Sequence, residues 1–325
     1  MNRRVSGGFT LNAARGRCVY WLFRLLRAVD QSVSRPAAYR IGYAVADLFY
    51  AFSRRSRPNC LANILHVLHY RGEDIDDPAV RARAEEIVRR NFRNFASYLV
   101  DFFRFSRLEQ ADLSSLVEVE GTENVERALR RGKGAVGVTA HLGNWELGGI
   151  VLSLLGFPVN AVALSYQNTK LNRLFVNQRA IGGVKVVEVG SAALQSLRAL
   201  KKNELVVILG DRDVTERGSA TEFFGAPAHI PRGPAALAVR SGASLFFGYL
   251  IRTSADRYRV VFRPPVEVEG SDDPDEREAR LTRALLKEME AVIMDHLDQW
   301  YMYYRVWGEG TGRQGPQGPQ GQQGQ

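Results

Sequence analysis

The stretch Ala135-Val136-Gly137-Val138-Thr139-Ala140-His141-Leu142-Gly143-Asn144-Trp145-Glu146-Leu147-Gly148-Gly149 decides how the rest of the chain is interpreted. Residues 135–140 are a short apolar run with β-branched side chains, which is typical of a buried strand. Asn144 can cap a following helix that has Glu146 in its first turn, where a negative charge is favoured. His141 is therefore expected on a strand-to-helix loop, the place where open α/β sheets present their functional groups.

His141 and Glu146 form a candidate catalytic pair. A histidine with an acidic partner is a general base whose tautomer and orientation the carboxylate fixes. Their spacing does not stack them on one helix, so the loop must fold Glu146 back toward the imidazole. The sequence has no Gly-x-Ser-x-Gly elbow and no cysteine in a nucleophile-like context, so the base would activate a hydroxyl group of the substrate. This logic suits acyl transfer to an alcohol; the alternative is a histidine and a glutamate that only stabilise a helix start.

The string from His141 to Gly149 resembles the His-x4-Asp/Glu signature of the lysophospholipid acyltransferase superfamily. It is most similar to the branch that holds the late acyltransferases of lipid A biosynthesis and the phosphatidylinositol mannoside acyltransferases, over residues 35–307. The resemblance implies an O-acyltransferase that takes a fatty acyl chain from an acyl carrier protein or coenzyme A thioester. It implies a hydroxyl of a membrane lipid or glycolipid as acceptor, and neither a metal nor a further cofactor. A lipid A precursor, a phosphatidylinositol mannoside or another glycolipid all fit.

The composition is that of a globular protein. The chain has 325 residues, 45% of them hydrophobic and 24% charged, which is enough for a large core. We expect one catalytic domain over 58–309, helical over 58–112, after an N-terminal helical segment over 1–57. Residues 310–325 are nearly all Gly, Pro and Gln and are predicted to be disordered. The two cysteines match no metal or redox spacing, and a reducing compartment is the default.

The net charge of +9 resides in residues 1–57, and the rest of the chain is balanced. A segment that is both basic and apolar predicts contact with an anionic membrane surface and does not favour a nucleic-acid partner. No run reaches the length of a spanning helix, but residues 17–29 are predicted to form a helix that lies in the headgroup region. The alternative is a soluble helix packed on the domain. With the resemblance, these features place the protein at the cytoplasmic face of the bacterial inner membrane.

Alternating strand and helix patterns predict the fold class α/β, with a mixed, mostly parallel central sheet flanked by helices and an N-terminal helical membrane-associating extension. We expect strands at 116–120, 135–140, 157–164, 184–189, 204–209, 244–251 and 257–268, the last two forming a hairpin. Helices are expected at 36–52, from Pro58 onward, and at 78–107, 122–131, 144–155, 168–181, 191–202, 232–241 and 274–299.

Asp211-Arg212-Asp213 is a second candidate site, because it follows the apolar strand 205–209. If that strand neighbours the one before His141, the two sites meet at the carboxyl edge of the sheet. The family carries a similar acidic string here, which implies that Asp211 or Asp213 belongs to the active site. Asp-x-Asp after a strand can also chelate a divalent ion that holds a sugar nucleotide. A metal-dependent glycosyltransferase is therefore the alternative function, and an exposed turn bridged by Arg212 is the structural alternative.

Two arginines are candidates for substrate binding. Arg179 ends a helix that resembles the family's Asn-rich helix, and its guanidinium could bind a phosphate or the donor's carbonyl oxygen; a charge that meets the helix dipole is an equal alternative. Arg232 lies in a Pro-x-Gly-Pro loop that leads into a helix, where a phosphate can bind. The aromatic end segment 299–307 echoes the family's ending and would line the lipid site or close the core.

The expected mechanism rests on His141, which removes the proton of the acceptor hydroxyl as its oxygen attacks the thioester. Glu146 would hold the imidazole and stabilise its charged form. Backbone N–H groups at the start of the following helix, with Arg179, would bind the oxyanion. A third class, a basic membrane or nucleic-acid adaptor without catalysis, predicts binding that weakens with salt and survives His141→Ala.

Overall fold

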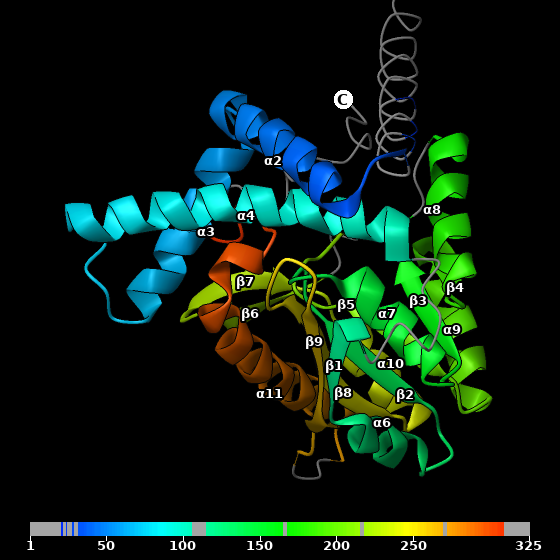
Figure 1. The fold of residues 1–325 in the computed structure, drawn as a ribbon. Coiled ribbons are helices and arrows are strands. Elements are labelled where there is room, and N and C mark those ends of the chain that lie inside the picture. The colour runs from blue at the N-terminus through cyan, green and yellow to red at the C-terminus, as the bar shows by residue number, and fades with distance from the viewer. Residues whose placement is uncertain are drawn as a thin grey trace, which may run out of the picture.

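The structure is a computed structural model that describes Trp21, Arg24, Ala28 and residues 32–105, 115–164, 168–214, 218–268 and 272–308. These residues form an α/β fold whose mostly parallel central sheet is covered by helices, which confirms the predicted fold class (Figure 1). Of the helix expected over 17–29, only three positions are described, and all three are helical. The rest of that helix and the tail 310–325 lie outside the described residues.

The predicted elements of the catalytic domain are present with shifts of a few residues at their ends. The helices are α2 (Arg35–Phe52), α3 (Ser56–Tyr70), α4 (Pro78–Phe105), α6 (Thr122–Leu129), α7 (Trp145–Leu154), α8 (Thr169–Ile181), α9 (Ala192–Lys201), α10 (Gly233–Ser241) and α11 (Pro274–Asp295), with the 3-10 turns η1 (Val189–Ser191) and η2 (Leu297–Gln299). The strands are β1 (Val117–Glu120), β2 (Ala135–Thr139), β3 (Val159–Ala163), β4 (Lys185–Glu188), β5 (Leu205–Leu209), β6 (Ser219–Phe223), β7 (Ala226–Ile230), β8 (Ser244–Arg252) and β9 (Tyr258–Pro265).

The central sheet has seven strands among the described residues, in the order β1-β9-β8-β2-β5-β3-β4. All neighbouring pairs are parallel except β8 and β9, which form the predicted hairpin. β2 occupies the middle of the sheet, between β8 and β5, and its five residues are all buried. The carboxyl end of the most protected strand therefore carries His141.

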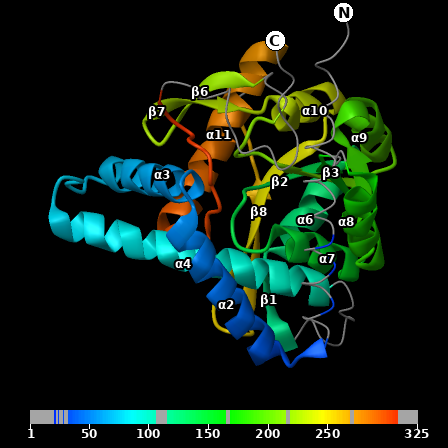
Figure 2. The same ribbon diagram turned by 90° about the horizontal axis from the view of Figure 1, so that it is seen from above.

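Helices cover both faces of the sheet because alternate strand residues point to opposite sides. On β8, Leu245 and Phe247 join one core cluster with α10 and α11, whereas Phe246 joins the other cluster with α6 and α7. Figure 2 shows these two helix pairs on opposite sides of the strands. The apolar face of each helix is thus buried against a strand face of matching character.

A two-stranded hairpin, β6–β7, was not predicted. Its turn contains Phe224 with φ 51° and Gly225 with φ 70°, the left-handed backbone that tight hairpins need. The strands are short and only partly buried, so their residues give a weak periodic signal.

The long helix α4 crosses the carboxyl-terminal edge of the sheet, and α2 packs across α4 at an angle (Figure 1). A buried polar cluster joins them: the hydroxyls of Tyr39 in α2 and Tyr258 in β9 each donate to Asp101 in α4 at 2.5 Å. Burial raises the pKa of Asp101 to about 6, although the hydroxyls and the charge of Arg252 favour its ionised form. The packed helix α4 therefore covers the carboxyl end of β2.

None of the described helices is both long enough and apolar enough to cross a bilayer.

Candidate active site

His141 lies on the loop between β2 and α7. Backbone hydrogen bonds tie this loop to residues 299–301 on one side and, from the N–H of Asn144 at 2.9 Å, to the Leu250 carbonyl of β8 on the other. The N–H of Tyr301 donates to the His141 carbonyl at 2.8 Å, and the N–H of Gly143 donates to the Gln299 carbonyl at 2.9 Å. Gly143 has φ 58°, and a Cβ built there would lie 1.9 Å from the Leu250 carbonyl oxygen. Only glycine fits this position without a change in the backbone.

The cap predicted at the start of α7 is also present, because Asn144 Oδ1 accepts a hydrogen bond from the N–H of Leu147 at 3.0 Å.

Asp211 is the carboxylate that contacts the imidazole. β5 pairs with β2 in the register Thr139↔Leu209, so the residues that follow the two strands lie side by side. Nδ1 of His141 lies 2.8 Å from Asp211 Oδ1, and the backbone N–H of His141 donates to Asp211 Oδ2 at 2.8 Å. The Asp211 side chain is fully buried, whereas that of His141 is 20% exposed. Asp211 is therefore held inside the protein, whereas the His141 imidazole can contact a substrate.

The environment of Asp211 keeps it ionised. Burial by itself raises the pKa of this carboxyl, but the attraction of His141 and hydrogen bonds from the His141 ring, the His141 backbone and Trp300 outweigh it, so the pKa lies below its usual value. An ionised carboxylate only accepts hydrogen bonds, so in the neutral imidazole Nδ1 carries the proton and Nε2 the lone pair. Within the described ranges no residue hydrogen-bonds Nε2. This is the arrangement of a general base.

The contact expected between Glu146 and His141 is not what the structure shows. Both oxygens of Glu146 accept hydrogen bonds from Arg179, from Nε at 2.8 Å and from Nη2 at 2.6 Å. The two side chains are 10% and 13% exposed, so this is a nearly buried, two-point ion pair between α7 and α8. Two of the predicted site residues are thus brought together, but the imidazole takes its carboxylate from the neighbouring strand.

Aromatic side chains pack between α4 and the His141 loop. The Trp145 ring lies 5.2 Å from the His141 ring and stacks on Tyr98 of α4 at 4.4 Å. Tyr301 contacts both aromatic rings, Trp145 at 6.1 Å and Tyr98 at 6.2 Å. Trp145 also lines a cavity of about 30 Å³ between α7 and the sheet, which has apolar walls and several glycines. The surroundings of the imidazole are therefore apolar on the side of the helices.

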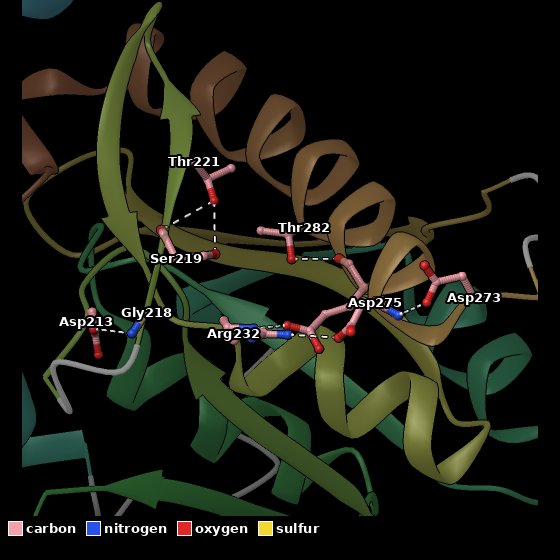
Figure 3. A network of polar contacts seen from close by, with 9 residues as sticks. Asp213, Gly218, Ser219, Thr221, Arg232, Asp273, Asp275 and Thr282 are labelled. Carbon is pink, nitrogen blue, oxygen red and sulfur yellow. Dashed lines mark hydrogen bonds and ion pairs between the residues drawn. The ribbon is translucent and has the colours of Figure 1, made fainter.

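Three predicted site residues lie away from the imidazole. Asp213 accepts a hydrogen bond from the N–H of Gly218 at 2.6 Å, within its own loop. The Arg212 guanidinium lies 4.6 Å above the Tyr304 ring. Figure 3 shows Arg232 turned toward α11, where it pairs with Glu278 and Asp275 at 2.6 and 3.2 Å.

Of Asp211 and Asp213, the two residues between which the sequence left the choice open, Asp211 contacts the candidate base and Asp213 does not. The same contacts are unfavourable for a divalent ion at Asp211. Three N–H groups approach the two oxygens of Asp211, and such positive donors are unfavourable beside a cation. In the ranges that the structure describes, no three His, Cys, Asp or Glu side chains come together as ligands would.

Trp300 is a site residue that the sequence analysis did not single out. Its indole N–H donates to Asp211 Oδ2 at 3.1 Å. The sequence offered a weak signal, the aromatic density of residues 299–307, but nothing in it indicated which ring would reach the site.

A family described as bacterial lipid A biosynthesis acyltransferase matches residues 13–309 of the chain. The chain is 25% identical to a phosphatidylinositol mannoside acyltransferase of Mycolicibacterium smegmatis, over 88% of each chain. It is 26% identical to a protein of the same name from Mycobacterium tuberculosis, over 79% of each. It is also 26% identical to a lipid A biosynthesis palmitoleoyltransferase of Escherichia coli, over 63% of this chain and 67% of that protein.

Proposed function

Because the chain belongs to the bacterial lipid A biosynthesis acyltransferase family, we propose that it transfers a fatty acyl chain from an acyl carrier protein or coenzyme A thioester to a hydroxyl of a membrane glycolipid. The relatives are named as a phosphatidylinositol mannoside acyltransferase and as a palmitoleoyltransferase of lipid A biosynthesis, and an acceptor from either class of glycolipid suits the proposal. The observation that carries it is the pair of His141 and Asp211, whose Nδ1–Oδ1 distance is 2.8 Å. No nucleophilic side chain of the protein is needed, since the acceptor hydroxyl is the nucleophile.

In the proposed reaction, Nε2 of His141 removes the proton from the acceptor hydroxyl as its oxygen attacks the thioester carbonyl. The imidazolium that forms is stabilised by the buried charge of Asp211. The tetrahedral intermediate then expels the thiolate, which takes the acceptor's proton from Nε2. The products are the new ester and the free thiol of the donor. Every step uses groups that the protein or its two substrates supply, and neither a metal nor another cofactor enters.

The developing oxyanion would be bound by N–H groups in the first turn of α7 and by the Arg179 guanidinium. In this proposal Glu146 acts through Arg179, because its two hydrogen bonds fix the plane of the guanidinium between α7 and α8. A guanidinium held in this way is also suited to a phosphate of the donor or acceptor. Glu146 thus keeps a place in the site, as a residue that positions an anion-binding group.

The α2 helix offers a surface for the lipid bilayer. It exposes a stripe of large apolar side chains, at 41% to 76% of their full area: Ile41, Val45, Leu48, Phe49 and Phe52. Exposed arginines lie beside this stripe, Arg40 within the helix and Arg54 and Arg55 just after it. An apolar stripe with a basic margin favours an anionic membrane surface.

We expect the double variant Leu48→Glu/Phe52→Glu to lose at least about tenfold in affinity for vesicles that contain phosphatidylglycerol, because burial of two such side chains contributes a few kcal/mol. Vesicle co-sedimentation measures this. Leu194→Glu is the control, since Leu194 is 57% exposed but lies on α9. An equal loss for both variants, or none for the double variant, would refute membrane docking through α2.

The function itself is tested with the purified chain, radiolabelled palmitoyl-coenzyme A or palmitoyl-acyl carrier protein, and phosphatidylinositol mannoside or lipid A precursor as acceptor. The label should move to the lipid with either carrier or with one of them, without added metal. Transfer of sugar from a sugar nucleotide, dependent on Mn²⁺ and without acyl transfer, would establish the glycosyltransferase alternative instead.

A further inference from the structure

Asp211 has hydrogen-bond donors on both oxygens, and one of them comes from outside the candidate base. Two donors belong to His141, its ring and its backbone N–H. The third donor that the structure describes is the indole Nε1 of Trp300, 3.1 Å from Oδ2. Asp211 and Trp300 are each 1% exposed, so water has little access to replace the indole if it is lost.

The Trp300 indole is itself held in place. Asn91 in α4 donates a hydrogen bond to the Trp300 carbonyl at 2.8 Å, and Trp300 forms an antiparallel bridge with Leu142 in the His141 loop. The ring lies 6.3 Å from Phe223 and 6.2 Å from Trp307 in an aromatic cluster. A side chain anchored in this way gives its N–H one fixed direction, which ends at Asp211 Oδ2.

A buried carboxylate is costly unless donors compensate for lost water, and a donor that favours the ionised form also limits its rotation. If Oδ2 loses the indole, the buried charge is less well compensated, so the ionised carboxylate that supports the protonated imidazole is disfavoured. The carboxylate can also turn away from Nδ1. Both changes would reach the imidazole, although neither a hydrogen bond nor a ring contact joins Trp300 to the His141 ring.

We propose that Trp300 is a positioning residue, whose indole N–H holds Asp211 ionised and aimed at Nδ1 of His141, so that Nε2 keeps its lone pair. This inference rests on the proposed function for its kinetic consequence, but the Trp300–Asp211 contact can be tested without it.

The test compares Trp300→Phe with Trp307→Phe. Trp307 is also buried, belongs to the same aromatic cluster, and donates its indole N–H to the Phe223 carbonyl at 3.0 Å. Each variant therefore removes one buried indole donor, but only Trp300→Phe removes it from Asp211. Thermal unfolding of both variants measures how much stability is lost when a buried indole donor is removed.

For Trp300→Phe we expect kcat/KM to fall about 10- to 100-fold, the range for a hydrogen bond to a charged group. We also expect the acid limb of its pH profile to move to lower pH, because a carboxylate that is less ionised and less well aimed at Nδ1 stabilises the imidazolium less. Trp307→Phe should keep the acid limb of the wild type and lose at most about threefold in rate. Equal acid limbs for Trp300→Phe and the wild type would overturn the inference.

A second measurement applies if Trp300→Phe does not fold. In ¹⁵N-tryptophan-labelled protein, the Trp300 indole proton among the four indole signals should move upfield in Asp211→Asn, because a neutral amide is a weaker acceptor. An unchanged signal would refute the contact. If the wild type transfers no acyl group, the proposed function fails, while the indole signal still decides whether Trp300 binds Asp211.

Discussion

His141→Ala is expected to lower kcat for acyl transfer by about 10²–10⁴-fold, the usual contribution of a positioned general base. Among the described side chains, Asp211 alone hydrogen-bonds Nδ1 of His141. In the same described part of the chain, no second base lies beside Asp211 that could replace the imidazole. Single-turnover transfer of a labelled acyl chain from the thioester measures the chemical step directly, and binding of the donor to the variant is measured separately.

Folding must be controlled, because the alanine leaves the buried Asp211 carboxylate with one donor fewer, which destabilises by about 1–3 kcal/mol. Thermal unfolding and vesicle binding monitor this effect. His229→Ala is a matched control, since His229 is an exposed histidine on the β6–β7 hairpin. If His141→Ala retains more than a third of the wild-type rate, the proposed mechanism is refuted.

Asp211→Asn should be at least as damaging, with a loss of about 10³–10⁴-fold in kcat near pH 7, as estimated from the equivalent change in a serine protease triad. The asparagine keeps the size of the side chain, but its amide N–H₂ can face Nδ1. Nδ1 then becomes the acceptor, the proton moves to Nε2, and the lone pair is lost from the atom that meets the substrate.

The comparison with Glu146→Gln separates the two carboxylates. Glu146 binds Arg179 at 2.8 and 2.6 Å, so its loss should weaken anion binding and leave the tautomer of His141 unchanged. We expect a smaller decrease, about 10- to 100-fold, with the acid limb of the pH profile in place. Near-normal turnover by Asp211→Asn, combined with a larger loss for Glu146→Gln, would return the orienting role to Glu146.

Much of the fold follows from local sequence. β2 and β5 are short apolar runs, and α7 begins after the predicted Asn144 cap, so residues near in sequence determine them. The predicted relation to the lipid A acyltransferase branch is confirmed as well, over a range slightly longer than expected, residues 13–309. The β6–β7 hairpin escaped because its turn depends on a left-handed Phe224, a conformation that phenylalanine rarely adopts.

The partner of His141 could not be derived from spacing. Glu146 is five residues away in the sequence, but it lies in the first turn of α7, where Arg179 of α8 binds it. Asp211 is 70 residues away and reaches the imidazole only because β5 pairs with β2. That pairing is a property of strand order, which periodicity does not encode. The Trp300 contact depends in the same way on how the carboxyl-terminal segment returns to the loop.

The left-handed Gly143 has a consequence for how the enzyme works. Because its backbone lies against the Leu250 carbonyl and both sides of the loop are hydrogen-bonded, the histidine is part of the rigid framework and does not belong to a lid. Little ordering entropy is then spent on the base when a lipid arrives. Any movement that admits two bulky substrates is therefore expected in the helices around the site. Nε2 of His141 keeps its position when the substrates bind.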